Sequence, residues 1–523
     1  MPKVIGFDSS TQSFSAILMD TAKGEIVAQE SVNFGKDLPH FGAPSGYMPG
    51  GESGEIHADP LMWLEALDLL LERMKKSGVE FSDVVALSGS GQQHGSVYLN
   101  ESFFEKVVAL DAGETLARQL ALCLTRKTSP IWMDSSTSHQ CAEIAAMIGG
   151  DNEVCRRTGS IMIERFTGSQ IRRFFQTDPV AYEKTAVIHL VSSFLASVMA
   201  GASAGIDRGD GAGMNLMNLE AGDWDAKMVT ATAPDLARKL PPVVASDSVV
   251  GLISNYFVEK FGFSPDCKVV AWTGDNPSSL VGMGATEPGK MVVSLGTSDT
   301  LFAAMEKPLT DPQGFGHVFG NPAGGFMSLI CFKNGSLARE AVKNHRGLDW
   351  ADFGVEGLQK TLAGNEGKLM LSFFAPEITP RVESEGATYQ PPAAMWSAEE
   401  EVRGVLEGQF LNMRLHAEWL GVKPEVILLT GGASLNDGVA QTVANIFKTP
   451  VARLEVAGSA CLGAGMRAAV TVRAAEMVDL VANFAAPSKG GGLLPDLALA
   501  QTYDDMLEKY REFLRESYPQ LTA

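Results

Sequence analysis

The sequence predicts an α/β protein that consists of two similar lobes. A strand–turn–strand element with small hydroxyl residues in its turn occurs near residue 4 and again near residue 292. In addition, buried apolar runs alternate with amphipathic helical segments, and polar loops follow several of these runs, which is typical of α/β folds. The length agrees with two lobes, because 523 residues are too many for one hydrophobic core.

The repeated element reads VIGFDSSTQS over residues 4–13 and VVSLGTSDT over residues 292–300. Each turn offers backbone N–H groups and hydroxyls, which is the chemistry that binds phosphate groups. One such turn on its own would indicate only an ordinary hairpin. Two of them at this spacing predict similar lobes around a nucleotide cleft.

The N-terminal lobe is expected to begin with three consecutive strands, at 4–8, 14–20 and 26–32. A loop rich in glycine and proline follows over residues 34–56, and its role stays open. A helix should then start at Pro60 with Asp59 as its N-cap. The next strand, residues 84–87, runs into the polar segment SGSGQQHG, and α/β proteins bind ligands at such strand ends.

The boundary between the lobes is expected near residue 250, where a proline pair and a polar run precede a new apolar segment. This gives an N-terminal domain of residues 1–250 and a C-terminal domain of residues 251–523. In the second, strands at 269–272 and 426–429 end in the polar segments TGDNPSS and TGGASLN. Helices are expected at three places, namely 399–420, the small-residue segment from residue 460, and about 499–517.

Composition excludes several classes of protein. The formal net charge of −20 argues against a nucleic-acid or anionic-membrane partner. The six cysteines form no CxxC pair, so neither a zinc site nor a disulfide framework is expected. The N-terminal segment does not read as a signal peptide, and no apolar run is long enough to span a bilayer. We therefore expect a cytoplasmic protein.

Two aspartates follow strands at positions where a carboxylate can take part in chemistry. Asp275 comes directly after the strand at 269–272, where it can accept the proton of a ligand hydroxyl as the base of a phosphoryl transfer. It could equally cap a helix that begins at Pro277. Asp8 ends the first strand and has a similar choice: it can hold a hydrated Mg²⁺ near the phosphates or only hydrogen-bond the turn.

Other polar residues suit a sugar or a nucleotide, each with an ordinary alternative. Gln93 and His94 offer donors for a polyhydroxy substrate, although a lone histidine is more often structural. Arg165 can bind sugar hydroxyls or form a surface salt bridge. The pair Gly431 and Gly432 allows close approach of a ligand or merely makes a turn.

Familiar phosphate-transfer motifs are missing from the sequence. There is no GxxxxGK[ST] segment and no protein-kinase HRD or DFG set. Asp134 and Asp299 lie near small polar residues, but their sequence context indicates no role for either.

Taken together, eight stretches resemble the FGGY family of carbohydrate kinases, and the resemblance covers nearly the whole chain. It is strongest to the branch of xylulose kinases of animal type. The stretches are SGSGQQHGSV (88–97), IWMDSST (131–137), ERFTG (164–168), GAGMNL (211–216), TGDNP (273–277), SLGTSDT (294–300), CFKNGSL (331–337) and TGGAS (430–434).

This resemblance implies two ribonuclease-H-like domains, as in actin and hexokinase, around a hinged nucleotide cleft. It also implies ATP and Mg²⁺ as cofactors, a small ketose as substrate, and a monomer or homodimer. The implied reaction turns D-xylulose and ATP into D-xylulose 5-phosphate and ADP. The implied roles are Asp275 as general base; His94, Arg165, Asp275 and Asn276 for the sugar; Thr11, Gly296, Thr297, Trp350, Gly431, Gly432 and Asn436 for ATP; and Asp8 for the metal.

Two segments depart from the family pattern. The first turn reads Ser9-Ser10-Thr11 where many members have Gly-Thr, and Trp132-Met133-Asp134 is not followed by the usual arginine. The phosphate contacts of the first turn therefore stay open. Alternative functions are a kinase for another ketose or a polyol, such as ribulose, and a non-catalytic sugar sensor. A chaperone-type ATPase is disfavoured, because only helix and linker are expected after residue 470.

Overall fold

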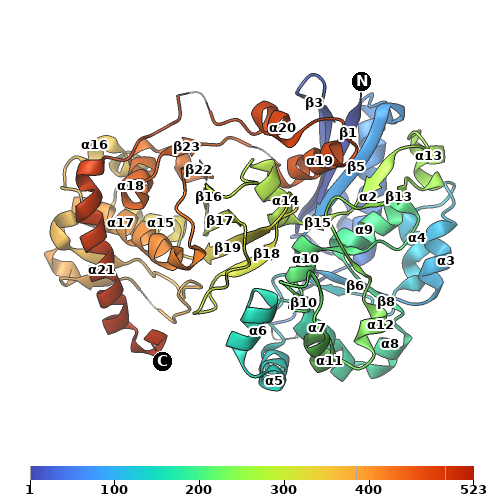
Figure 1. Ribbon diagram of the computed structural model, residues 1–523, viewed down its shortest axis with the longest axis horizontal. Coiled ribbons are helices and arrows are strands. Elements are labelled where there is room, and N and C mark those ends of the chain that lie inside the picture. The colour runs from blue at the N-terminus through green and yellow to red at the C-terminus, as the bar shows by residue number, and fades with distance from the viewer. Residues whose placement is uncertain (1, 53, 385, 457, 489, 523) are drawn as a thin grey trace. The chain divides into compact units, whose positions relative to one another are not determined.

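The computed structural model describes residues 2–52, 54–384, 386–456, 458–488 and 490–522 (Figure 1). The chain forms two compact α/β units. The first contains Met1–Thr286, Val318–Phe326 and Val456–Ala486, and the second contains Glu287–His317, Met327–Glu455 and Pro487–Ala523.

The first unit contains a mixed sheet whose strands follow the order β13-β14-β5-β1-β2-β3, with β15 also paired to β5. β1 is antiparallel to β2 and parallel to β5, so Asp8, Ser90 and Gly274 lie near the same edge of the sheet. The three predicted N-terminal strands are confirmed. The strands are β1 (Lys3–Ser9), β2 (Ser13–Asp20), β3 (Glu25–Asn33), β5 (Val84–Gly91), β13 (Val249–Leu252), β14 (Lys268–Val270) and β15 (Thr273–Gly274).

The second unit repeats this topology. Its sheet follows the order β18-β19-β17-β16-β22-β23, with β18 (His317–Gly320) as the edge strand next to β19. β16 is antiparallel to β17 and parallel to β22. The same relations hold for β3-β2-β1-β5-β14 in the first unit, so the predicted duplication and the α/β fold class are confirmed. These strands are β16 (Lys290–Leu295), β17 (Asp299–Met305), β19 (Phe326–Phe332), β22 (Val426–Thr430) and β23 (Val451–Arg453).

Helices cover both faces of the first sheet because alternate residues of its strands point to opposite sides. Ile5 and Phe7 join the core beneath α2 (Pro60–Lys76), whose N-cap is Asp59 as predicted. Val4 points the other way, into a core with α19 (Ser459–Thr471). A Cβ at Gly6 would lie 1.8 Å from the Cys461 carbonyl oxygen, so the glycine lets this distant helix approach β1 closely (Figure 1).

The compact units divide the chain differently from the boundary expected near residue 250. β13 and β14 pair into the first sheet, and the segment from Thr273 to Thr286 stays with it. Residues 456–486 return to the first unit, because the small residues of α19 pack against α14 (Asp275–Gly282). Ser278, for example, donates its hydroxyl hydrogen to the Ala460 carbonyl at 2.8 Å.

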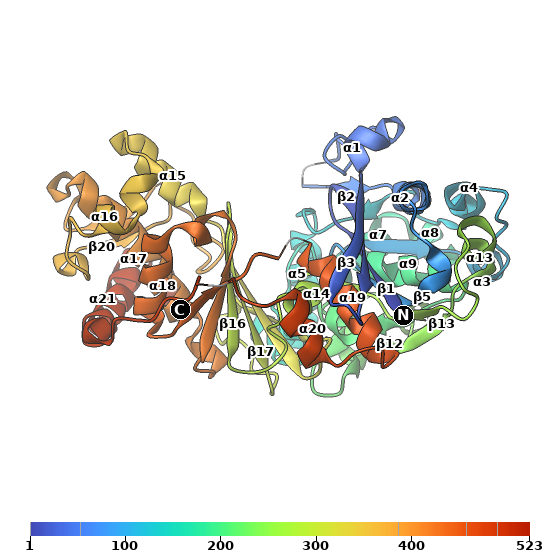
Figure 2. The same cartoon turned by 90° about the horizontal axis from the view of Figure 1, so that it is seen from above.

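The other helices and short strands surround these two sheets. In the second unit α15, α17, α18 and α21 lie on one side of β16 and β17 (Figure 2). No helix among the described residues is long and apolar enough to cross a membrane.

In the first unit the remaining elements are α1 (Phe34–Asp37), α3 (Ser102–Val108), α4 (Leu116–Leu120), α5 (Ser138–Ile148), α6 (Asp151–Thr158), α7 (Thr167–Thr177), α8 (Pro179–Lys184), α9 (Val191–Ala200), α10 (Arg208–Ala212), α11 (Ala226–Thr232), α12 (Leu236–Lys239), α13 (Asn255–Phe261), α20 (Met477–Phe484), β4 (His57–Ala58), β6 (Ser96–Leu99), β7 (Ser129–Pro130), β8 (Val187–Leu190), β9 (Ile206–Asp207), β10 (Met217–Asn218), β11 (Asp223–Trp224) and β12 (Val243–Val244). In the second unit they are α15 (Ser336–Arg346), α16 (Val355–Leu358), α17 (Ala398–His416), α18 (Asp437–Phe447), α21 (Ala500–Ser517), β20 (Leu369–Leu371) and β21 (Thr388–Gln390).

Candidate active site

Asp275 is the first residue of α14 and follows β15 directly. The helix begins two residues before Pro277, with Gly274 as its N-cap, so Asp275 does not cap a helix that starts at Pro277. Its Oδ1 accepts hydrogen bonds from the backbone N–H of Asn276 at 2.9 Å and from the Asn276 amide at 3.2 Å. The same amide donates to Gln93 Oε1 at 2.9 Å, so three polar side chains hold one another at the end of β5 and β15.

The electrostatics of this strand edge favour a proton acceptor near neutral pH. Burial raises the pKa of Asp275 to about 6. Hydrogen bonds from the backbone of Asn276 and Gln93 act in the opposite direction but are outweighed. Burial and the nearby Asp275 carboxylate raise the pKa of Asp8 to about 7, while the Ser90 hydroxyl, which donates to Asp8 Oδ1 at 2.7 Å, lowers it. Two carboxyl groups in one poorly solvated site thus resist ionising together.

Several buried polar atoms at this edge have no hydrogen-bond partner among the described residues. They are Gln93 Nε2, Thr273 Oγ1, Ser9 Oγ and Asp210 Oδ1. A polar atom that is buried and unpartnered costs free energy, so such a group of atoms points to a polar ligand that supplies the missing partners. The Gln93 side chain lies against Gly274, where a Cβ would meet its Cγ at 2.4 Å.

Asp210 belongs to this site, although sequence reasoning missed it. It lies on α10, and the Ser192 hydroxyl donates to its Oδ2. Burial and the carboxylates of Asp207 and Asp275 raise its pKa well above the usual range. The sequence did offer a signal for it, because Asp210 directly precedes residues 211–216, one of the stretches that resemble the kinase family.

His94 and Arg165 also lie in the first unit, and both contact the Phe166 ring. His94 Nδ1 donates to the Gly213 carbonyl at 2.7 Å, which leaves Nε2 of the neutral ring as a hydrogen-bond acceptor. Burial, reinforced by the Arg165 charge, lowers the pKa of His94 to about 3. The imidazole stacks on Phe166 with ring centroids 4.2 Å apart, and the Arg165 guanidinium lies over the same ring at 5.5 Å.

The turn between β1 and β2 is closed by its own hydroxyls. Ser10 donates its N–H and its hydroxyl hydrogen to the Ser13 carbonyl, each at 2.9 Å. Thr11, at the tip, accepts a hydrogen bond from Trp132 Nε1 at 2.8 Å. The turn is thereby ordered with the Thr11 hydroxyl hydrogen free to donate elsewhere.

The second unit contains a separate cavity of about 560 Å³, a size typical of small-ligand sites. Five predicted nucleotide residues line it: Gly296, Thr297, Trp350, Gly432 and Asn436. Residues that sequence reasoning did not single out, such as Ser336, Phe353 and Leu435, complete the lining.

Gly431 does not line this cavity but makes its wall possible. The residue has φ +88°, and a Cβ there would lie 2.3 Å from the Leu295 carbonyl oxygen, so only glycine fits. Asn436 caps α18 through its Oδ1, and its amide donates to the Trp350 carbonyl at 3.3 Å. The cap thus connects the two sides of the cavity.

Asp299, for which the sequence indicated no role, is part of a buried ion pair. Both of its carboxylate oxygens accept hydrogen bonds from Arg339, each at 3.1 Å. The pair holds the start of β17 against α15 beside the turn that contains Thr297.

The described residues contain no group of three or more histidine, cysteine or acidic side chains that could hold a metal ion by themselves. Mg²⁺ often binds through only one or two carboxylates and completes its shell with phosphate oxygens and water. The half-buried carboxylate of Asp8, with its raised pKa, fits that pattern, because a cation would offset the cost of its charge.

Family models match most of the chain. The N-terminal domain of the FGGY family of carbohydrate kinases matches residues 125–282, and its C-terminal domain matches residues 291–472. Xylulose kinase of Rattus norvegicus is 42% identical, over 97% of this chain and 96% of the relative. Xylulose kinase 2 of Arabidopsis thaliana is 40% identical, over 89% and 86%.

Solved structures agree on the fold. The xylulose kinase from Rhodospirillum rubrum superposes with a TM-score of 0.82 at 19% identity and covers all of both chains. The Plasmodium falciparum glycerol kinase with ADP has a TM-score of 0.78 at 17% identity and covers 98% of each chain. With the duplicated sheets and the strand-edge aspartates, these matches show that the chain belongs to the FGGY family of carbohydrate kinases.

Proposed function

We propose that the protein transfers the γ-phosphoryl group of ATP to the terminal hydroxyl of D-xylulose, which yields D-xylulose 5-phosphate and ADP. The observation that carries this proposal is Asp275, a carboxylate with a pKa of about 6 among unpartnered buried polar atoms. The substrate is proposed from relatives about 40% identical over most of the chain, which bear the name xylulose kinase.

Asp275 would act as the general base. Its carboxylate accepts the proton of the sugar hydroxyl as the hydroxyl oxygen forms a bond to the γ-phosphorus, and the bond between that phosphorus and the bridging oxygen breaks. The electron pair of that bond leaves with ADP. A pKa of about 6 suits this role, because the group is mostly ionised at neutral pH yet more basic than an exposed aspartate. The Asn276 amide, bonded to both Asp275 and Gln93, keeps the carboxylate in position.

The sugar would be bound by the neighbours of Asp275. His94 is neutral and offers Nε2 as an acceptor, while Arg165 and the Gln93 amide offer donors. A polyhydroxy ketose provides both kinds of partner at several carbons, which matches this mixture of donors and acceptors.

The nucleoside part of ATP would occupy the cavity of the second unit. The exposed Trp350 ring offers a face for stacking on adenine. Asn436 and Gly432 also line this cavity. Thr297, which lines this cavity, and Thr11 in the first unit each carry a hydroxyl that would bind phosphate oxygens.

Asp8 would hold Mg²⁺ together with the phosphates. When bound, the ion neutralises charge on the phosphate oxygens and lowers the cost of two ionised aspartates in one site.

The proposal is tested by measuring ADP release with purified protein, ATP and Mg²⁺. The acceptors are D-xylulose, L-xylulose, D-ribulose, L-ribulose, glycerol and no sugar. We expect release to depend on sugar and to be greatest with D-xylulose. A preference for another acceptor would reassign the sugar site but keep the kinase, whereas equal release with and without every sugar would refute the sugar-kinase function.

A further inference from the structure

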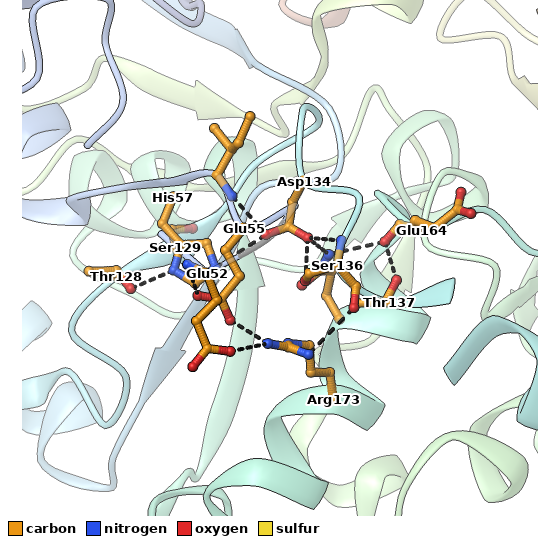
Figure 3. A network of polar contacts seen from close by, with 12 residues as sticks. Glu52, Glu55, His57, Thr128, Ser129, Asp134, Ser136, Thr137, Glu164 and Arg173 are labelled. Carbon is orange, nitrogen blue, oxygen red and sulfur yellow. Dashed lines mark hydrogen bonds and ion pairs between the residues drawn. The ribbon is translucent and has the colours of Figure 1, made fainter. Parts of the chain in front are cut away.

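The carboxylate of Asp134 joins three parts of the first unit. Its side chain is fully buried and accepts several hydrogen bonds (Figure 3). Burial would raise the pKa of Asp134, but the neighbouring His57, Ser136 and Gln170 side chains outweigh it and keep the pKa low. The hydrogen-bond donors on Oδ1 are Ser136 N at 2.9 Å, Ser136 Oγ at 2.6 Å and Gln170 Nε2 at 2.8 Å. Ile56 N donates to Oδ2 at 3.0 Å, and His57 Nε2 lies 3.3 Å from the same oxygen.

A first connection leads from Asp134 to the turn between β1 and β2. Trp132 lies two residues before Asp134, whose carboxylate also closes the 134–136 turn through Ser136. The indole N–H donates to Thr11 Oγ1 at 2.8 Å. A hydroxyl has one hydrogen to donate, so a lone pair occupied by Trp132 orients the Thr11 hydrogen toward another acceptor. Trp132 is 44% exposed, so its ring is not part of the hydrophobic core.

The second connection is the segment of residues 43–52 and 54–58, which we call the strap. At one end a Cβ on Gly46 would lie 1.7 Å from the Thr11 carbonyl oxygen, so the strap rests on the turn. At the other end Ile56 N–H is bound by Asp134, and β4 pairs with β7. Figure 3 shows Arg173 reaching Glu52 and Glu55 of the strap from the side of α7.

The third connection leads to Arg165. Gln170 Nε2 donates both to Asp134 Oδ1 and to the carbonyl of Glu164, at 2.8 and 3.0 Å. Thr137 Oγ1 donates to the same carbonyl at 2.5 Å. Glu164 directly precedes Arg165, so these bonds hold the backbone from which the Arg165 side chain extends.

We propose that Asp134 is a positioning residue that holds both the phosphate-facing hydroxyl of Thr11 and the sugar-binding Arg165. It acts on Thr11 through Trp132 and the strap, and on Arg165 through Gln170. The proposal rests on the proposed kinase function and assigns separate effects to the two connections. Loss of the Trp132 bond weakens the use of ATP, and loss of the Gln170 bonds weakens the use of sugar.

The test compares single substitutions with matched controls of the same chemistry. Trp132→Phe removes the indole N–H and shrinks the ring to a phenyl group. Its control is Trp224→Phe, which makes the same change in ring size and loses an indole hydrogen bond to the Pro241 carbonyl. Gln170→Met removes the amide. Its control is Gln140→Met, because the Gln140 amide donates to Gln176 and not to Asp134 or Glu164 among the described residues. One hydrogen bond contributes about 1 kcal/mol. We therefore expect Trp132→Phe, which loses one bond, to raise the KM for ATP about fivefold, and Gln170→Met, which loses two, to raise the KM for sugar about fivefold to 30-fold. Each variant should leave the KM for the other substrate unchanged, and both control variants should have wild-type KM values.

Asp134→Asn should raise both KM values. Its control is Asp225→Asn, because Asp225 is another buried aspartate of this unit that accepts hydrogen bonds from a backbone N–H, an amide and an arginine. The control should change neither KM. A merely structural role would lower the Tm and the yield of active enzyme with unchanged KM values. If Asp134→Asn does not fold, the proposal is tested by Trp132→Phe and Gln170→Met alone. It is overturned if Trp132→Phe has a wild-type KM for ATP, or if both variants change the KM for the same substrate. Wild-type activity on the sugar panel is measured first, so failure of the kinase function is recognised separately.

Discussion

Replacement of Asp275 by asparagine tests the proposed base most directly. Asparagine has the same shape and keeps an oxygen to accept the Asn276 hydrogen bonds, but it cannot take up the proton of the sugar hydroxyl. We expect kcat to fall about 10²–10⁴-fold, the usual range for lost general-base help. Sugar and ATP affinities, measured by calorimetry, should change less than about twofold.

The same substitution should stabilise the protein near neutral pH. The pKa of Asp275 is raised from 3.8 to about 6, which corresponds to about 3 kcal/mol at most. The residue is half-buried, so about 1–2 kcal/mol is a better expectation. Since the folded state holds this proton more tightly than the unfolded state, the group lowers stability as pH rises from about 4 to about 6 and keeps it lowered above. The Tm of Asp275→Asn should therefore exceed that of the wild type at pH 7.5, with the difference shrinking toward pH 4.

The pH profile supplies the decisive assay. Wild-type kcat/KM should fall about tenfold for each pH unit below about 6, and the asparagine variant should lose this dependence. Asp311→Asn serves as control, because Asp311 is a buried aspartate of the second unit that accepts three backbone N–H bonds. That variant should lose stability but keep kcat. Near-normal turnover in Asp275→Asn, or an unchanged acidic limb, would refute the base assignment.

Three further predictions concern other residues of the two units. His94→Gln should raise the KM for sugar about tenfold at every pH from 5 to 9, because burial keeps the histidine neutral with a pKa of about 3; a wild-type sugar KM that follows a group titrating near pH 6.5 would contradict this. Trp350→Ala should raise the Kd for an ATP analogue several-fold with little change in Tm, since the ring is 47% exposed, and equal affinity by calorimetry would exclude it from the site. Arg339→Met should lower the free energy of unfolding by about 3–5 kcal/mol, because it leaves the buried Asp299 charge unpaired. In urea denaturation the double variant Arg339→Met, Asp299→Asn should recover part of that loss, and no recovery would contradict the ion-pair explanation.

Much of the fold could be predicted because its signals are local. The two hydroxyl-rich turns, the Asp59 cap of α2 and the strand before Thr430 each depend on residues within a few positions of one another. The duplication also could be recognised, because each copy carries the same local pattern. The first residue of α14 was misplaced by two positions, since Pro277 is a strong signal for a helix start but tolerates a helix that begins earlier.

The predicted site residues could be named one by one, but their arrangement could not. Asp275, His94 and Asn436 stand at strand or helix ends with recognisable neighbours, and this is a local property of the sequence. The pKa of Asp275 depends on burial by segments from several parts of the chain, so no local pattern reports it.

The sequence by itself therefore determined the fold class, the duplicated turns and the identity of the proposed base. Tertiary structure alone decided that α19 packs beside β1, that Asp210 shares the site of Asp275, and that Trp132 binds Thr11 from 121 residues away. These contacts join distant segments of the first unit. Their free energy comes from burial and from hydrogen bonds whose partners come together only once that unit has folded.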